Sequence, residues 1–327
     1  MKKTIIIKTD GSNKIGLGHI YRSINLAKEL KKNNFRIVFL TNSIIVKKIV
    51  PKSFIVINYK NDLNELIKIL DEFKPKIIVI DKLEENKKEL KIMIEKTIIF
   101  TIDYIGKNKN FVKKGINILY QISGSQKKNS FSGFKFAILN DSIKNKQPIE
   151  ISKKVKKILI IQGGSDTPCN TPIIIDSLNQ INEKLLINVI VGASFQCWKE
   201  LDDSITHSSH KIKLHNNIKN IGKIMKLNDL AITGGGITCL ELCHLGIPSV
   251  LICGAPFENE TTSLLEKKGF GVNLGYRKKI SRKKIVNATK NLMTDYNQRK
   301  KMNKVGKKLI DGNGTLRVSN EILRLIK

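Results

Sequence analysis

Residues 4–22, TIIIKTDGSNKIGLGHIYR, contain the pattern that decides the fold of this chain. The uninterrupted apolar run Ile5–Ile7 predicts a buried strand, and apolar residues at helical spacing from Ile20 onward predict a helix after it. Between the two, Gly16 and Gly18 allow tight turns and let a ligand approach the backbone closely. A strand, a glycine-rich turn and a helix are typical of the first unit of a parallel α/β sheet.

Strands and helices continue to alternate along the first half of the chain. Runs rich in Ile and Val predict strands, and longer amphipathic segments between them predict helices. Uninterrupted apolar runs are typical of parallel strands that are covered by helices on both faces. Strands are expected at Ile37–Leu40, Phe54–Ile57, Ile77–Ile80, Ile98–Ile102 and Ile116–Leu119, and helices over Asn61–Phe73 and Glu84–Glu95.

A polar, lysine-rich stretch, Asn140–Lys157, separates this half from a second one in which the pattern restarts. The chain has 327 residues, and single cores stop growing at about 250–300 residues. We therefore expect two domains, residues 1–148 and 149–327. Strands are expected in the second at Ile158–Gln162, Leu186–Val191, Lys211–Leu214, Leu230–Thr233, Ser249–Ile252 and Gly271–Leu274, followed by helices over Ser281–Lys327 that are broken at Asp311–Gly314.

Each half is thus predicted to be a Rossmann-like, doubly wound α/β domain. In such a pair the ligand site is expected in the cleft between the domains, at the carboxyl ends of the strands. No apolar run approaches the roughly 20 residues that span a bilayer. The first apolar stretch is also shorter than the roughly 7-residue core of a secretory signal. We therefore expect a cytoplasmic protein that does not insert into membranes.

The charge balance is strongly basic, with 59 Lys and Arg against 28 Asp and Glu, a net charge of +31. A nucleic-acid-binding protein is one interpretation of this charge. However, the basic residues are mostly Lys and are spread along the whole chain, whereas base reading and bidentate phosphate contacts favour Arg. We therefore expect a solvated basic surface that attracts anionic substrates such as nucleotide diphosphates, and no nucleic-acid partner.

The five cysteines are Cys169, Cys197, Cys239, Cys243 and Cys253. An odd number without paired C-x-x-C spacing argues against a disulfide framework and against a zinc site. No metal is therefore expected from these residues.

The glycine-rich turn after the first strand carries a histidine, His19, at the start of the predicted helix. The free N–H groups of a helix start favour an anion nearby and disfavour protonated imidazole, which leaves His19 neutral and able to accept a proton. The alternative is that His19 only caps the helix. The turn lacks the third glycine of the dinucleotide fingerprint, because Tyr21 stands at that position.

Three further turns between strands and helices are candidate ligand sites. Gly163-Gly164-Ser165-Asp166 leaves backbone amides open for a ligand, and the alternative, equally consistent with these residues, is a strand-to-helix turn in which Ser165 or Asp166 caps the helix. Gly234-Gly235-Gly236 suits a diphosphate that approaches backbone N–H groups, with the Thr238 hydroxyl beside it. Glu241, one helical turn further on, is placed to accept hydrogen bonds from ribose hydroxyls. Asn259 either binds substrate or caps the next helix.

In this order and spacing, the segments resemble the nucleotide-sugar hydrolases of pseudaminic acid biosynthesis and the related spore-coat-polysaccharide proteins, which are classed with glycosyltransferases. The segments that carry the resemblance are DGSNKIGLGHIYRS at residues 10–23, QGGSD at 162–166, GGGITCLELCHLGIP at 234–248, FENE at 257–260 and DGNGTLRV at 311–318. Asp81 and Asp103 stand where members of the family carry acidic strand ends. Glu260 and Asn140 depart from the Gln and Arg that are usual in relatives.

The resemblance implies a GT-B-type fold with no required metal or cofactor. It implies that UDP sits mainly on the C-terminal domain while the sugar faces the N-terminal domain. By the resemblance, His19 is the general base that activates water. The substrate-binding residues it implies are Asp10, Gly18, Arg22, Gly164, Ser165, Asp166, Gly235, Gly236, Ile237, Thr238, Glu241 and Asn259, with Glu241 at the ribose and Gly236–Thr238 at the diphosphate.

The leading hypothesis is hydrolysis of UDP-2,4-diacetamido-2,4,6-trideoxy-β-L-altropyranose, or of a closely related UDP-diacetamido sugar, to UDP and the free sugar. One imidazole and two glycine-rich helix starts supply a base and N–H donors for the departing diphosphate. No segment suggests the carboxylate pair about 5 Å apart that a retaining glycosidase needs. The alternative is a GT-B glycosyltransferase that uses a UDP-sugar donor in surface polysaccharide synthesis.

Overall fold

The computed structural model describes residues 2–11, 17–108, 112, 114–119, 130–216, 218 and 220–326. The chain divides into two compact units. The first comprises Met1–Ile138 and Asn313–Lys327, and the second comprises Leu139–Gly312. This division differs from the expected boundary in two ways. Residues 139–148 belong to the second unit, and the last helix returns to the first unit instead of ending the second one.

The first unit is built on a seven-stranded parallel sheet with the order β3-β2-β1-β4-β5-β6-β7. The sequence predicts all of these strands within a few residues except β7, whose three residues are too few to give an apolar run. The strands are β1 (Thr4–Thr9), β2 (Arg36–Thr41), β3 (Ile55–Asn58), β4 (Ile77–Asp81), β5 (Ile98–Ile102), β6 (Lys114–Asn117) and β7 (Ser130–Ser132).

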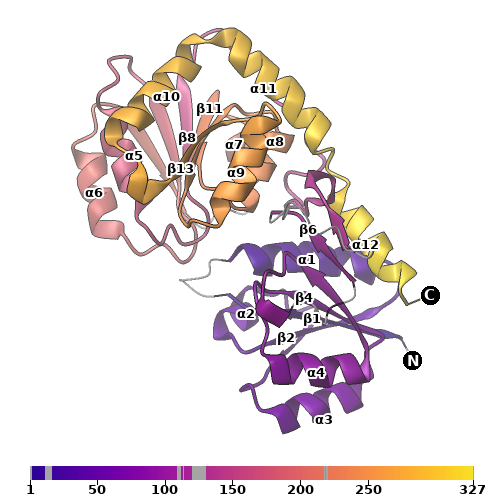
Figure 1. The fold of residues 1–327 in the computed structure, drawn as a ribbon. Helices are drawn as coiled ribbons and strands as arrows, with labels where there is room; N and C mark the ends of the chain where they lie inside the picture. The colour runs from indigo at the N-terminus through magenta and orange to yellow at the C-terminus, as the bar shows by residue number, and fades with distance from the viewer. Residues whose placement is uncertain are drawn as a thin grey trace. The chain divides into compact units, whose positions relative to one another are not determined.

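Helices cover both faces of this sheet (Figure 1). Ile6 and Ile78 point to the face on which Leu66 and Leu70 of α3 and Met93 of α4 form one buried cluster. On the opposite face α1 packs against β1, and α12 packs against α1. The helices are α1 (Gly18–Lys31), α2 (Ile44–Ile49), α3 (Leu63–Phe73), α4 (Lys87–Lys96), the short 3-10 helix η2 (Phe134–Phe136) and α12 (Gly314–Arg324).

The second unit has a six-stranded parallel sheet with the order β10-β9-β8-β11-β12-β13. All six strands lie where the sequence predicts them. In the first sheet β1 lies between β2 and β4, and in the second β8 lies between β9 and β11. The strand order reverses at this first strand, which is the pattern of a doubly wound fold. The strands are β8 (Lys157–Ile161), β9 (Leu186–Ile190), β10 (Lys211–His215), β11 (Leu230–Thr233), β12 (Ser249–Cys253) and β13 (Val272–Tyr276).

Two layers of helices enclose the second sheet (Figure 1). Helices α5, α6 and α10 pack together on one face, and α8 packs against α11 on the other. The helices are α5 (Asn170–Leu178), α6 (Trp198–Thr206), α7 (Ile221–Met225), α8 (Ile237–His244), α9 (Glu258–Lys267), η3 (Arg277–Lys279), α10 (Arg282–Thr294) and α11 (Tyr296–Leu309). Among the described residues no helix is long and apolar enough to cross a bilayer.

One expectation about the cysteines is wrong. Cys169 and Cys197 form a disulfide whose Cα atoms are 6.0 Å apart. Each is the residue that precedes a helix, α5 and α6 respectively, and the packing of these two helices brings their starts together. A separation of 28 residues carries no sequence signal of this pairing. The other three cysteines are free and buried.

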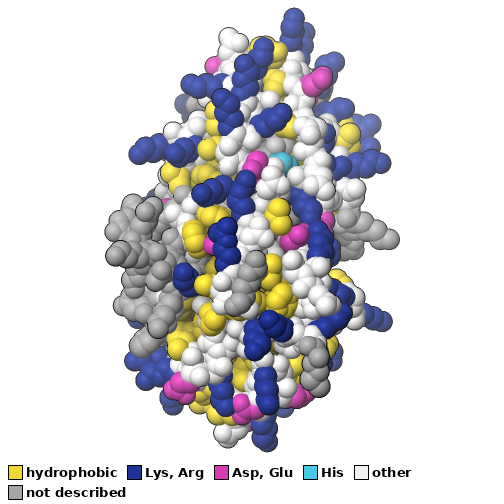
Figure 2. Space-filling view, turned by 90° about the vertical axis from the view of Figure 1, so that its right-hand side faces the viewer, with side chains coloured by type: hydrophobic (Ala, Val, Ile, Leu, Met, Phe, Trp, Pro, Cys, Tyr) yellow, Lys and Arg dark blue, Asp and Glu magenta, His cyan; other side chains and the backbone are white. Residues whose placement is uncertain are grey.

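The basic residues do not gather into one patch on the face shown in Figure 2. Lys and Arg side chains are distributed over the whole of that face, with Asp and Glu side chains among them. On this face the basic side chains are therefore dispersed and exposed to solvent.

Candidate functional site

His19 lies in the first turn of α1, just beyond the carboxyl end of β1. The residue before the helix, Leu17, makes no side-chain cap, and no acidic residue stands in the first turn. Among the described residues no side chain caps the first N–H groups of the helix, and such N–H groups favour an anion. A Cβ atom added to Gly18 would meet nothing within 4 Å, so this position leaves space beside the backbone.

A carboxylate orients the His19 ring. Its Nδ1 atom lies 2.8 Å from Oδ1 of Asp81, the last residue of β4. Because an ionised carboxylate only accepts hydrogen bonds, this contact selects, for the neutral ring, the tautomer with its proton on Nδ1 and its lone pair on Nε2. The contact of 3.2 Å between Nδ1 and Nη2 of Arg22 is consequently not a hydrogen bond to the ring. The side chain is 11% exposed, so one edge of the imidazole reaches the surface of the unit.

Arg22 holds Asp81 in place. Its Nε atom donates to Oδ1 and Oδ2 of Asp81, both at 2.9 Å, and its Nη1 atom pairs with Asp103. Ser23 Oγ donates to Asp81 Oδ2 at 2.9 Å. Burial by itself would raise the pKa of Asp81, but the Arg22 charge and the bonds from His19 and Arg22 lower that pKa to about 2. Asp81 is therefore ionised at neutral pH.

Asp103 completes the buried charge cluster of the first unit. It follows β5 with a left-handed backbone, φ 51°, and its Oδ1 atom accepts from the backbone N–H groups of Ile118, at 2.6 Å, and Leu119, at 2.9 Å. Burial would lower the pKa of Arg22, but the charges of Asp81 and Asp103 raise it well above its ordinary value. The Arg22 side chain is 2% exposed, so its guanidinium serves these two carboxylates.

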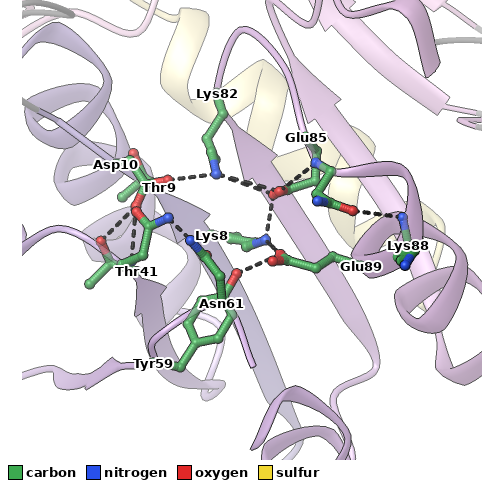
Figure 3. Close-up of polar contacts among 12 residues, drawn as sticks. Lys8, Thr9, Asp10, Thr41, Tyr59, Asn61, Lys82, Glu85, Lys88 and Glu89 are labelled. Carbon is green, nitrogen blue, oxygen red and sulfur yellow. Dashed lines mark hydrogen bonds and ion pairs between the residues drawn. The ribbon is translucent and has the colours of Figure 1, made fainter. Parts of the chain in front are cut away.

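Asp10 lies at the same edge of the sheet, directly after β1. Its Oδ1 atom accepts from Thr41 Oγ1 at 2.9 Å and from the Asn42 N–H at 3.0 Å, and its Oδ2 atom pairs with Lys82 Nζ at 2.6 Å (Figure 3). Burial would raise the pKa of Asp10, but Lys82 and the hydrogen bonds lower it. Asp10 thereby ties together the ends of β1, β2 and β4.

The ion pairs continue from Lys82 into the interior, as Figure 3 shows. Lys8, a fully buried residue of β1, pairs with Glu85 at 2.5 Å and also with Glu89. Tyr59 donates its hydroxyl to Glu89 at 2.6 Å. Buried ions cost free energy unless they are paired, and here each has an opposite charge. The network ties β1 and the end of β4 to the segment that leads into α4. Sequence patterns do not reveal Lys8, Lys82, Glu85 and Glu89 as a network, because Lys8 and Asp10 lie far along the chain from their partners.

The QGGSD segment of the second unit follows β8 and leads to α5. The Gly164 carbonyl accepts from the Ser194 N–H at 3.1 Å, and Ser165 Oγ lies 3.2 Å from Thr167 Oγ1. Asp166 accepts from the N–H groups of Asn170 and Thr171, each at 2.8 Å, one on each carboxylate oxygen. Its side chain therefore caps α5, which is the alternative raised from the sequence. Substrate binding by Gly164, Ser165 and Asp166 stays a prediction.

The triple-glycine segment follows β11 and leads directly into α8. Gly236 precedes the helix without a side-chain cap, and no acidic residue stands in the first turn. Gly236, Ile237 and Thr238 therefore present backbone N–H groups at a helix start with positive potential, whereas the Gly235 N–H donates to Glu258 Oε2 at 3.3 Å. This is the geometry that a diphosphate requires.

Glu241 and Asn259 complete the candidate residues of the second unit. Glu241 is 7% exposed, and its Oε1 atom accepts from the Asn140 N–H at 3.2 Å. Burial raises the pKa of Glu241 to about 7, despite that hydrogen bond. Asn259 is exposed in the first turn of α9, and its Oδ1 atom accepts from Asn273 Nδ2 at 3.2 Å. Asn259 does not act as the cap of α9, since Phe257 holds that position.

The structure thus places the predicted residues in two groups, each at the carboxyl edge of one sheet. Asp10, Gly18, His19 and Arg22 belong to the first unit, and the residues from Gly164 to Asn259 belong to the second. Of the wider sequence motif, residues 12–16 lie outside the described part of the chain. Within the described part, no three His, Cys, Asp or Glu side chains are placed to hold a metal ion.

A family model for the glycosyltransferase family 28 C-terminal domain matches residues 135–312, more than half of the chain. The chain belongs to this family. The match corresponds closely to the second unit, Leu139–Gly312. MurG of Acinetobacter baumannii has a similar structure, with a TM-score of 0.72 over 98% of this chain and 99% of that one at 12% identity. The fold is accordingly that of the GT-B glycosyltransferases, with two Rossmann-like units, as the sequence predicts.

Three proteins with related sequences extend the comparison. An uncharacterized protein of Methanocaldococcus jannaschii is 35% identical over 301 residues, 85% of this chain, and the chain spans 59% of its length. The spore coat polysaccharide biosynthesis protein SpsG of Bacillus subtilis is 24% identical over 96% of both chains. The UDP-2,4-diacetamido-2,4,6-trideoxy-beta-L-altropyranose hydrolase of Campylobacter jejuni is 24% identical over 83% of this chain and 99% of its own.

Proposed function

We propose that this protein hydrolyses a UDP-linked diacetamido-trideoxyhexose, UDP-2,4-diacetamido-2,4,6-trideoxy-β-L-altropyranose or a close relative, to UDP and the free sugar. The observation that carries the proposal is the His19–Asp81 pair, with 2.8 Å between Nδ1 and Oδ1. A histidine that donates from Nδ1 to a buried carboxylate has its Nε2 lone pair ready for a proton. The hydrolase from Campylobacter jejuni, with which the chain aligns over 83% of its length, supports the choice of substrate.

The reaction needs a base and a stabilised leaving group. As a water oxygen attacks the anomeric carbon, Nε2 of His19 takes the proton of that water, and the bond from the anomeric carbon to the diphosphate oxygen breaks. The electron pair of that bond leaves with UDP. Asp81 stabilises the imidazolium that forms, as the carboxylate does in catalytic triads. Because Asp81 keeps a pKa of about 2, it remains a carboxylate throughout.

The second unit supplies the nucleotide-binding residues in this proposal. The N–H groups of Gly235, Gly236, Ile237 and Thr238 bind the diphosphate, and they stabilise the negative charge that develops on it. Glu241 accepts hydrogen bonds from the ribose hydroxyls, and Asn259 binds the substrate. Asp10 and Arg22 act as positioning residues, since their charged atoms are already paired with Lys82 and with Asp81 and Asp103.

Replacement of His19 tests the proposal. His19→Ala should reduce release of UDP and free sugar by at least about a hundredfold, because general-base catalysis typically contributes 10²–10⁴-fold. UDP binding, measured by calorimetry, should be nearly unchanged. The exposed His207 offers a matched control, and His207→Ala should keep wild-type turnover. Products are identified by mass spectrometry from a panel of UDP-diacetamido sugars, and unchanged turnover in the His19 variant refutes the assignment.

A glycosyltransferase is the second candidate function, and the match to a glycosyltransferase family model is the observation that favours it. The same base would then deprotonate an acceptor hydroxyl instead of water. The protein incubated with UDP-sugar alone separates the two. A hydrolase releases UDP and sugar in equal amounts, whereas a transferase stays nearly silent until an acceptor is added.

A further inference from the structure

A carboxylate of the second unit lies against the triple-glycine segment. Glu258, the first residue of α9, accepts with its Oε2 atom from the Gly254 N–H at 2.7 Å and from the Gly235 N–H at 3.3 Å. The backbone N–H of Ala255 also donates to this carboxylate. One side chain therefore takes N–H donors from two loops, the one between β11 and α8 and the one between β12 and α9.

The close approach depends on the glycines. A Cβ atom on Gly235 would lie 2.7 Å from Cβ of Glu258 and 3.0 Å from Cγ2 of Thr262, so only glycine fits there. At Gly236 the nearest atom to an added Cβ is Glu258 Oε1, at 3.9 Å. The carboxylate thus lies over the start of α8, where the diphosphate is proposed to bind.

Carboxylates and phosphates use the same backbone N–H donors, and a group of such donors at helix starts forms an anion site. In this structure an internal carboxyl group, that of Glu258, occupies part of that site. We propose that the Glu258 carboxyl group competes with the diphosphate of the substrate for these backbone N–H donors. In the empty site Glu258 bonds to both loops, and it moves away when a nucleoside diphosphate binds. This inference rests on the proposed nucleotide site of the second unit.

Competition follows from the charges. Two anions of the same sign a few ångströms apart repel, so the diphosphate and the Glu258 carboxylate cannot share these donors without a large cost. When an internal group occupies a site, the apparent dissociation constant equals the intrinsic one divided by the fraction of molecules in which the site is free. Removing the Glu258 carboxylate should therefore strengthen binding of the diphosphate, whereas binding of the nucleoside part should not change.

Calorimetric titration with three probes tests the inference: UDP, uridine and inorganic pyrophosphate. Glu258→Gln removes the charge, and Glu258→Ala removes the acceptor as well. Both should bind UDP and pyrophosphate about tenfold or more tightly than the wild type, in line with hydrogen bonds to charged groups. Uridine binding should not change. Glu200→Gln, which neutralises an exposed carboxylate in α6 of the same unit, is the charge-matched control and should behave as the wild type.

Each other outcome has a definite meaning. If both Glu258 variants are folded, as judged by circular dichroism, and bind UDP more weakly, Glu258 is a permanent part of the site and the inference is overturned while the proposed nucleotide site stands. If no form binds UDP but the variants gain affinity for pyrophosphate, the proposed nucleotide site fails and the anion competition stands. In the wild-type protein the amide resonances of Gly235 and Gly254 should shift on UDP binding, and resonances that stay unmoved count against displacement of Glu258.

Discussion

His19 and Asp81 come from segments 62 residues apart, and their contact gives the imidazole a defined tautomer. The chemistry proposed for this protein depends on that tautomer, because only a proton on Nδ1 leaves Nε2 free to act as a base. Arg22 and Ser23 fix the carboxylate in turn, so the geometry of the base is set by four side chains of which α1 supplies three.

Asp81→Asn tests this arrangement. The amide can present its NH₂ group to the ring and stabilise the opposite tautomer, so we expect turnover to fall by about 10²–10⁴-fold, as loss of the correct tautomer does in catalytic triads. UDP binding by the second unit should stay within about twofold of the wild type. Asp71→Asn, at a largely exposed carboxylate paired with Lys96, provides the control and should be fully active. Turnover within a few-fold of wild type for Asp81→Asn would show that the carboxylate does not orient the base.

Glu241 gives the protein a pH-dependent stability with a defined sign. Its pKa is about 7 in the folded protein and 4.5 when exposed, so the folded state holds the proton more tightly. The stability from this group is present below pH 4.5 and is lost as pH rises to about 7, by roughly 3 kcal/mol at about 1.4 kcal/mol for each pH unit. Denaturant unfolding of Glu241→Gln should lack this loss, while the exposed Glu183→Gln should retain it. Parallel profiles for wild type and Glu241→Gln would contradict the assignment.

At the scale of elements, helix starts carry the proposed chemistry, and their positions depend on how the helices pack. Helix α8 bears Thr238 and Glu241 and packs against α11. The contact is close at Gly306, where an added Cβ would overlap with the carbonyl oxygen of Cys243 in α8. The two helices can approach this closely because glycine has a hydrogen atom where any other residue has a Cβ atom.

Gly306→Ala should consequently displace α8. Alanine favours an isolated helix by about 1 kcal/mol over glycine, but overpacking costs typically 1–3 kcal/mol, so we expect net destabilisation and weaker UDP binding. Lys304→Ala is the control, because it also introduces alanine into α11 but on the exposed side, where no overlap with α8 arises. It should bind UDP as the wild type does. Unfolding curves and UDP titrations of both variants measure the effect, and a more stable Gly306→Ala protein would show that the helices have room to separate.

At the scale of the whole chain, the last helix completes the first unit. After the second unit ends at Gly312, α12 packs against α1 and against η2. Its apolar face, with Val318 and Ile322 fully buried, covers the helix that carries His19 and Arg22. The C-terminal segment therefore supports the helix that carries the proposed base, His19, near the N-terminus.

Ile322→Ala should destabilise the first unit by about 2–4 kcal/mol, the usual cost of truncating a buried Ile. Hydrogen exchange followed by mass spectrometry should show faster exchange in α1 while the strands of the second unit remain protected. Leu316→Ala, at a residue of α12 that is 48% exposed, is the matched control and should leave exchange unchanged. Faster exchange in the second unit alone would contradict the assignment of α12 to the first.

The sequence by itself determined the two Rossmann-like sheets. Runs such as Ile77–Ile80 and Val250–Ile252 are apolar throughout and are separated by amphipathic segments, a pattern that is typical of parallel strands with helices on both faces. It also located His19 and the triple-glycine segment, because glycine-rich turns between a strand and a helix are local features. Each of these turns can be recognised from a few consecutive residues, without knowledge of the rest of the fold.

The tertiary structure decided everything that depends on residues distant in the chain. The pairing of His19 with Asp81, the burial of Lys8 between Glu85 and Glu89, and the disulfide of Cys169 with Cys197 all join segments that hydrophobic periodicity does not relate. The return of α12 to the first unit is of the same kind, since an amphipathic helix shows that it has a buried face but not which surface covers it. Hydrophobic periodicity indicates which side chains are buried, whereas the residues that they contact depend on the tertiary arrangement of the chain.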